Sequence, residues 1–197
     1  MIDLTGKKIV AVDAECLRDV VTPYTFGASQ FLGNAVTCSV TNDDEYKDWI
    51  LDAGIFPFYK YLLGFDLIIG FNTLSFDYPL WGGSMLGPEH LEARTIFTKT
   101  FTGKTVDLCL DFFSALGVRT GLESVSVPTL GDKKEMHGVY APQLWRQGKC
   151  EEVISYCRGD VRRTLNLFLK ANAGEELKVQ PKNSTDIKIF KCEPKIR

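Results

Sequence analysis

Two acidic residues stand two positions apart near the start of the chain, at the end of an apolar run. Asp13 and Glu15 follow residues 9–12, which read as a buried β-strand. Side chains two positions apart on a strand point to the same face, so the two carboxylates would lie side by side. Two like charges held that close are costly unless a cation neutralises them. The spacing therefore predicts a cation-binding site on the strand.

Two more acidic residues fall where they can join this pair. Asp77 stands where the apolar strand 65–71 gives way to a helix, and loops at strand ends of α/β sheets often carry sites. Asp160 lies on the long helix 150–174, one turn after Tyr156. If this helix packs on the strand, four carboxylates converge without a matching Lys or Arg. Such an oxygen-rich pocket suits Mg²⁺ or Mn²⁺ better than zinc.

Two divalent ions held roughly 4 Å apart can activate water and stabilise a leaving oxygen, which is the chemistry of phosphodiester cleavage.

The elements that must position the acids follow from hydrophobic periodicity and turn residues. The predicted strands are 8–15, 26–32, 35–41, 65–71 and 104–110. The predicted helices are 41–52, one beginning within 75–81, 111–117, 122–131, 141–148 and 150–174. This order predicts an α/β fold, a mixed sheet flanked by helices.

Three segments carry a resemblance to a known family. The segments VDAE, IIGFNTLSFDYPLW and YCRGDVRRT, in this order, resemble the three motifs of the DEDD-family 3′-to-5′ exonucleases, whose fold is ribonuclease H-like. The middle segment is most similar to the exonuclease domain of family B DNA polymerases. Tyr156, four residues before Asp160, matches the tyrosine (DEDDy) branch, and Ser155 stands where the histidine branch needs His. The motifs extend from residue 13 to residue 160.

The resemblance implies a role for each of five residues. Asp13, Glu15 and Asp160 would hold the ion that activates water. Asp13 would also bridge to a second ion, which Asp77 would hold through bound water. Tyr156 would position the attacking water. The implied activity is 3′-to-5′ hydrolysis of single-stranded nucleic acid, DNA favoured over RNA, with two Mg²⁺ or Mn²⁺ ions and release of nucleoside 5′-monophosphates.

Four further residues are candidates for binding the strand end. Asn72 and Phe76 would contact the terminal nucleotides by a hydrogen bond and by packing on a base or sugar, although Phe76 would fit equally well as a core residue. Leu17 and Arg18, just past the first motif, would approach the strand end. Neither Asn72 nor any other residue can be assigned to reading the 2′-hydroxyl that distinguishes RNA.

Several basic residues have two readings each. The arginines around Asp160 would contact the substrate backbone or pair with acids on neighbouring helices: Arg158, Arg162 and Arg163. Lys133 and Lys134 would meet phosphates or belong to a solvated loop. From Lys178 onward six basic residues stand against two acidic ones, so a basic tail follows an acidic body. This tail would contact a polyanion or form a solvated, partly disordered end.

Composition bounds the class of protein. A chain of 197 residues with 45% hydrophobic content fits one globular domain, which we expect over 1–174 as the exonuclease domain, with a basic C-terminal tail at 175–197. No apolar run approaches the roughly 18 residues of a membrane span, and no signal segment follows Met1, so we expect a cytoplasmic protein without membrane contact. The six cysteines form no CxxC pair, which argues against structural zinc and for reduced thiols.

Two other classes of function stay open. A nucleic-acid-binding module without catalysis would keep the fold, and a structure-selective endonuclease of the same superfold would use similar metals. Because no polymerase domain follows the motifs, we expect a stand-alone enzyme or a subunit, with a separate polymerase or helicase as a natural partner.

Overall fold

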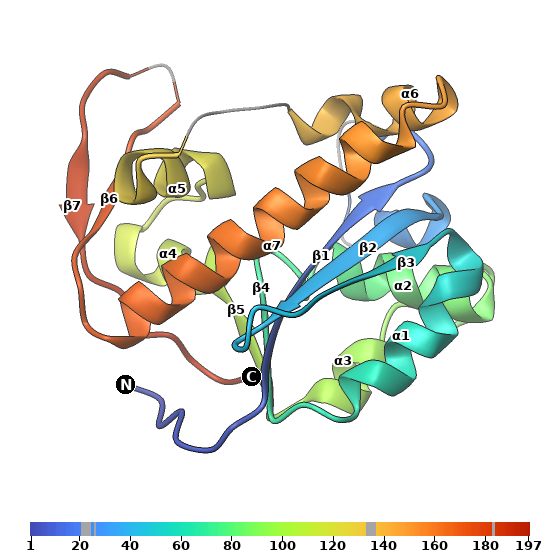
Figure 1. The fold of residues 1–197 in the computed structure, drawn as a ribbon, viewed down its shortest axis with the longest axis horizontal. Helices are drawn as coiled ribbons and strands as arrows, with labels where there is room; N and C mark the ends of the chain where they lie inside the picture. Colours follow the sequence, from blue (N-terminus) through green and yellow to red (C-terminus); the bar gives the residue numbers. More distant parts are fainter. Residues whose placement is uncertain (21–24, 26, 133–136, 183) are drawn as a thin grey trace.

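A five-stranded mixed sheet forms the centre of the computed structural model, which describes residues 1–20, 25, 27–132, 137–182 and 184–197. The strand order is β3-β2-β1-β4-β5 (Figure 1). The strands are β1 (Ile9–Cys16), β2 (Asn34–Thr41), β3 (Tyr46–Ile50), β4 (Leu67–Gly70) and β5 (Thr105–Asp107). The pairs β1–β2 and β2–β3 are antiparallel, whereas β1–β4 and β4–β5 are parallel. The predicted mixed α/β sheet is confirmed.

Helices cover both faces of this sheet. They are α1 (Ile55–Leu62), α2 (Asp77–Leu86), α3 (Ile96–Phe101), α4 (Leu108–Leu116), α5 (Leu122–Leu130), α6 (Ala141–Arg146) and α7 (Cys150–Asn172). The long helix α7 crosses the sheet diagonally and packs on β1 and β2 (Figure 1). None of the helices in the described part of the chain is both long and apolar enough to cross a membrane.

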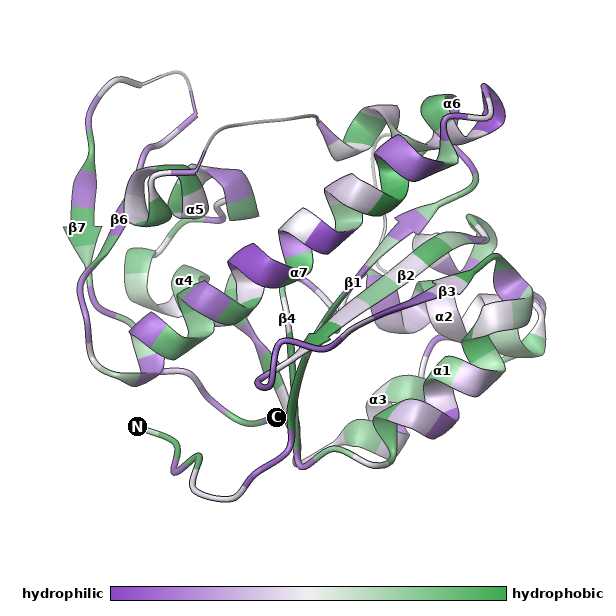
Figure 2. Cartoon of the chain, viewed as in Figure 1, coloured by the Kyte–Doolittle hydropathy of each residue, from purple (hydrophilic) through white to green (hydrophobic). Residues whose placement is uncertain are grey.

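The alternation of side chains along β1 divides the core in two. Ile9 and Ala11 pack with residues of α4, α5 and α7 on one face. Val10 and Val12 pack with α1, α2 and α3 on the other face. Figure 2 shows the hydrophobic colour concentrated along β1 and β2, while α7 alternates between hydrophobic and hydrophilic residues. Because the period of a strand is two, Asp13 and Glu15 continue the face that α7 covers.

The basic C-terminal segment is folded back onto the domain. It forms the antiparallel hairpin of β6 (Leu177–Val179) and β7 (Lys188–Phe190), and β6 packs on α5. Near the end of the chain Ile196 forms a β-bridge with Val106, and the Arg197 guanidinium donates to buried Asp111 at 2.6 Å. The alternative of a disordered tail does not hold for these described residues.

Three local predictions are wrong. The predicted helix 41–52 contains strand β3 instead, which pairs with β2 from Val36↔Ile50 to Val40↔Tyr46. The predicted strand 26–32 contains a 3₁₀ turn at Ala28–Phe31. The predicted strand 104–110 ends at Asp107, whose carboxylate accepts the backbone N–H of Cys109 at 3.0 Å and caps α4. Helices α1 and α3 were not predicted.

Candidate metal centre

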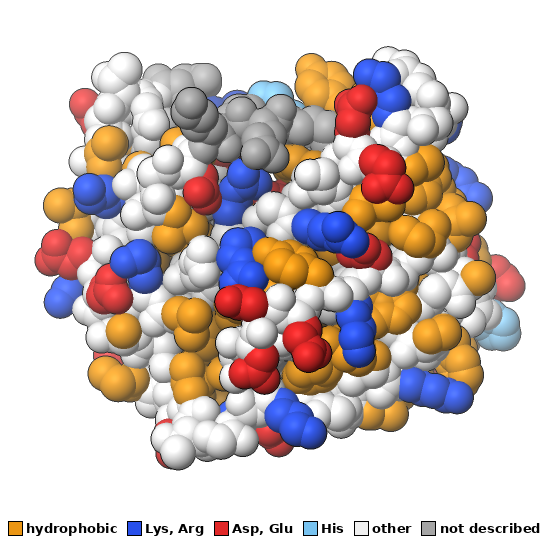
Figure 3. Space-filling model, viewed as in Figure 1, with side chains coloured by type: hydrophobic (Ala, Val, Ile, Leu, Met, Phe, Trp, Pro, Cys, Tyr) orange, Lys and Arg blue, Asp and Glu red, His pale blue; other side chains and the backbone are white. Residues whose placement is uncertain are grey.

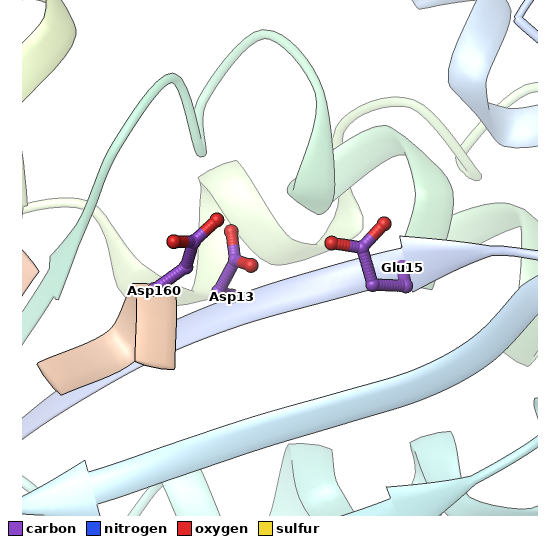
Figure 4. A group of neighbouring side chains, drawn as sticks. All are labelled: Asp13, Glu15 and Asp160. Atoms are coloured by element: carbon purple, nitrogen blue, oxygen red, sulfur yellow. The ribbon is translucent and has the colours of Figure 1, made fainter. Parts of the chain in front are cut away.

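Strand β1 and helix α7 bring three carboxylates together. Asp13 and Glu15 project from β1, and Asp160 projects from α7 toward them (Figure 4). One oxygen from each side chain lies within 4.8 Å of those of the other two. Residues from the first and third motifs, about 145 positions apart in sequence, therefore meet at one point, as a site for a divalent cation requires.

Local packing fixes this arrangement. Asp13 and Glu15 lie opposite Cys38 and Val36 of β2, and the register shifts after Glu15, so a β-bulge ends the regular strand beside the site. On α7, buried Cys157 faces β1, where its Sγ lies 3.5 Å from the carbonyl oxygen of Asp13 and 3.7 Å from its Oδ2. Asp160, one turn after Cys157, is thereby held at the edge of the core.

Burial and mutual repulsion perturb the first two carboxylates. The pKa of Asp13 is raised well above its usual range, mainly because the group is removed from water and then because Asp77, Asp160 and Glu15 are near. Burial likewise raises the pKa of Glu15, with Asp160 and Asp77 adding to the effect. Without a cation these groups favour the protonated state, whereas a divalent ion would reverse that preference.

One acidic residue has a basic partner. Arg163 Nη1 donates to Asp160 Oδ1 at 2.8 Å, and its Nε lies 3.4 Å from Asp132 Oδ2. The prediction that no Lys or Arg matches the acids is therefore wrong for Asp160. Burial still raises the pKa of Asp160, but the hydrogen bonds from Arg163 and Tyr156 oppose the shift. Asp160 is thus the carboxylate whose negative charge is best stabilised in the cluster.

Asp77 lies at the start of α2, outside the group of three but within electrostatic reach of it. Its side chain is 2% exposed, and burial raises its pKa to about 8, although the Thr73 hydroxyl partly opposes the shift. The charge of Asp77 raises the pKa of both Asp13 and Glu15. All four predicted metal ligands therefore belong to one electrostatic site.

Tyr156 stands beside the carboxylates on α7. Burial raises the pKa of its phenol, followed by the charges of Asp160, Glu15 and Asp13. The hydroxyl therefore stays protonated and can donate a hydrogen bond. Gly138 closes over it: a Cβ at this glycine would lie 3.4 Å from the Tyr156 hydroxyl and 3.8 Å from Glu15 Oε1. Both distances are ordinary van der Waals contacts, so Gly138 lies directly against the site.

Sequence reasoning missed the residue that holds the second motif in place. Asp107, at the end of β5, is fully buried and accepts the backbone N–H groups of Asn72 at 2.9 Å and Leu74 at 3.0 Å. Asn72 has a left-handed backbone, with φ 64°, so the loop needs such support. An acid at the end of a strand, followed by an apolar helix, was the available signal, because Asp is a preferred N-cap.

The four predicted strand-end ligands flank the site on two loops. Asn72 and Phe76 lie between β4 and α2, where half-buried Phe76 packs against the core with α1–α3 and its carbonyl accepts the Ser29 hydroxyl at 2.7 Å. Leu17 and Arg18 follow β1. The Arg18 side chain is exposed and its Nη1 donates to the Phe31 carbonyl at 2.6 Å. Their contacts with a substrate remain a prediction.

The arginines around Asp160 pair with acids, as one of their two readings predicted, but these acids lie on strand β3, on loops and on α7 itself rather than on neighbouring helices. Arg158 binds Asp48 of β3 through two hydrogen bonds. Arg162 donates to Asp44 at 2.6 Å and to the Tyr46 hydroxyl at 2.9 Å. Figure 3 shows basic and acidic side chains next to one another on the face that α7 crosses. The prediction for Lys133 and Lys134 falls outside the described residues.

Comparison with known proteins adds a fold neighbour. No protein-family model and no curated protein matches the sequence. Among solved structures, the chain is similar to the family B DNA polymerase of the hyperthermophilic archaeon Pyrobaculum calidifontis, with a TM-score of 0.57 and 20% identity. The match covers 83% of this chain and 24% of the polymerase chain. Together with the observed sheet topology, this similarity confirms the predicted ribonuclease H-like fold.

Proposed function

We propose that this chain is a metal-dependent nuclease of the DEDDy type, which removes nucleotides from the 3′ end of single-stranded nucleic acid. The observation that carries the proposal is the cluster of Asp13, Glu15 and Asp160 within 4.8 Å. Its desolvated acids sit on the face that α7 covers, where a fold without a ligand would place apolar side chains. The three motif segments and the family B polymerase as fold neighbour support the same activity.

The donor set fits Mg²⁺ or Mn²⁺. All the nearby ligands are carboxylate oxygens, and the only basic side chain bonded to them among the described residues is Arg163, which binds one oxygen of Asp160 and leaves its other oxygen and the carboxylates of Asp13, Glu15 and Asp77 to bind cations. Asp13, Glu15 and Asp160 would hold one ion, and Asp13 with Asp77 would hold the second. Such ions supply activation of water and stabilisation of the leaving oxygen.

The protein's own groups would then position the reaction. The Tyr156 hydroxyl stays protonated and points into the cluster, where it would orient the attacking water. Asn72 and Phe76 would grip the terminal nucleotides of the strand. The cluster is partly buried, so charge interactions between protein and substrate are stronger there than in bulk water.

A direct test uses a strand labelled at its 5′ end, single-stranded DNA and RNA in parallel, with Mg²⁺ or Mn²⁺ and a chelator control. We expect stepwise shortening from the 3′ end that the chelator abolishes, and protection of a strand whose 3′ end is blocked. Internal cuts would indicate an endonuclease, binding without cleavage a non-catalytic module, and release from the 5′ end the opposite polarity.

The Asp13→Ala variant tests the site itself. This substitution removes a carboxylate shared by both proposed ions, so cleavage should disappear while circular dichroism shows a folded protein. Asp43→Ala, which removes an exposed carboxylate in the turn before β3, is the matched control and should cleave at the parent rate. Full activity of folded Asp13→Ala would refute the assignment.

A further inference from the structure

A large cavity extends from the carboxylates to the C-terminal hairpin. Its volume is about 990 Å³, at the upper end of the roughly 300–1,000 Å³ typical of small-molecule sites. Tyr156 and Asp160 line one end, and Lys182 and Lys188 of the hairpin line the other. We call this cavity the tail groove. The basic tail thus forms a wall of a space that opens directly onto the candidate metal centre.

Among the described residues that line the tail groove, unpaired basic side chains outnumber unpaired acidic ones. Arg119, Lys182 and Lys188 line it, and none of the three forms an ion pair with another described residue. Of the acids in its wall, Asp160 is paired with Arg163, and Glu123 lies 3.8 Å from His137. The groove therefore offers uncompensated positive charge to a ligand, although the chain as a whole has a net charge of −2.

Helix α5 adds a second feature that favours an anion. Its N-terminus, with Gly121 at the N-cap and no side-chain cap, lines the groove, and the positive end of a helix dipole attracts negative charge. Ser126, one turn into α5, also lines the groove and is 1% exposed. Its hydroxyl has no hydrogen-bond partner among the described residues. A buried hydroxyl without a partner is costly, and an anionic oxygen entering the groove would satisfy it.

We infer that the tail groove binds the phosphates of the single strand that lie upstream of the scissile bond, with Lys182, Lys188 and Arg119 as their partners. This inference rests on the proposed function. A strand whose 3′ end occupies the carboxylates must leave the site along a path that tolerates its charge, and this groove is continuous with Tyr156 and Asp160. The hairpin β6–β7 is then a substrate-binding element of the domain.

The double variant Lys182→Ala/Lys188→Ala, called the groove variant, tests the inference. Its control is the double variant Lys191→Ala/Lys195→Ala, which removes two exposed lysines of the same segment that do not line the groove. Binding of a fluorescent 12-nucleotide single strand is measured over a range of salt concentrations in Ca²⁺, and a gel verifies that the strand stays intact. Cleavage of a dinucleotide in Mg²⁺ is measured in parallel.

We expect the groove variant to lower the slope of log affinity against log salt by about 1.4, at roughly 0.7 for each lost phosphate contact. Over the tenfold range from 1 M to 0.1 M salt, the ratio of parent affinity to variant affinity should therefore increase roughly 25-fold. The control should bind like the parent, and both variants should cleave the dinucleotide at the parent rate, because a dinucleotide reaches only the carboxylate end.

The outcomes separate this inference from the proposed function. In one outcome, the groove variant shortens the 12-nucleotide strand and its affinity and salt slope equal those of the parent. This outcome would overturn the inference about the groove but leave the proposed nuclease activity intact. Loss of affinity in the groove variant, without cleavage by any form of the protein, would support the groove and refute the nuclease. Equal losses in both double variants would show that only the total charge of the tail matters, which also overturns the groove.

Discussion

Replacement of Asp77 by Asn should stabilise the metal-free protein at high pH and destabilise it slightly at low pH. Asp77 is 2% exposed, and burial raises its pKa from 3.8 to about 8. Between these values the folded protein keeps a proton that the unfolded chain has lost. Stability contributed by this group is therefore full below about pH 4 and is lost as the pH rises toward 8.

The magnitude follows from linkage. One extra proton bound by the folded state makes the free energy of unfolding fall by about 1.4 kcal/mol per pH unit. Over the interval from 3.8 to about 8, the upper limit for Asp77 is roughly 6 kcal/mol. Asn removes this dependence but places an amide in a site shaped for a carboxyl group, at a cost of about 1 kcal/mol at every pH. The stability curves of parent and variant should therefore cross roughly 0.7 pH units above 3.8, at about pH 4.5.

The assay is urea unfolding in a chelator at pH 4, 5, 6, 7 and 8. Asp43→Asn, which neutralises an exposed carboxylate, is the control for changing the net charge by one. Addition of Mn²⁺ at pH 8 should stabilise the parent more than Asp77→Asn, because the variant lacks a proposed ligand. Parallel curves for parent and Asp77→Asn would refute the account of Asp77 as a desolvated carboxylate that a cation must neutralise.

Three further predictions concern the neighbours of Asp77. Tyr156→Phe keeps the ring but deletes the hydroxyl, so single-turnover cleavage at saturating Mn²⁺ should slow by up to about 100-fold with metal affinity unchanged; a parent rate would make the tyrosine a packing residue. Asp160→Asn should weaken metal binding in a titration and lose far more activity, and an unchanged metal affinity would contradict its role as a ligand. Asp107→Ala should lower the free energy of unfolding by about 1–3 kcal/mol, because the N–H groups of Asn72 and Leu74 lose their acceptor; stability equal to that of the parent would show that water replaces the carboxylate.

Local patterns in the sequence were sufficient for the elements that carry the acids. The apolar run before Asp13 predicted β1, and the periodicity around Cys157 and Val161 predicted α7, because each depends on residues within a few positions of one another. The two-residue spacing of Asp13 and Glu15 predicted their common face. The order of the three motifs predicted the ribonuclease H-like fold.

Contacts between distant segments decided the rest. The segment Tyr46–Ile50 has a spacing that also suits a helix, and only its hydrogen bonds to β2 make it a strand. The proximity of Asp13 to Asp160, and the approach of Gly138 to Tyr156, depend on how α7 packs on β1. No local pattern reveals that Lys188 lines the same cavity as Asp160, because the hairpin reaches it by packing on α5. Sequence periodicity predicts helices and strands, because these depend on residues close together in the chain. Burial, charge pairing and cavities depend on how distant segments pack against one another and exclude water.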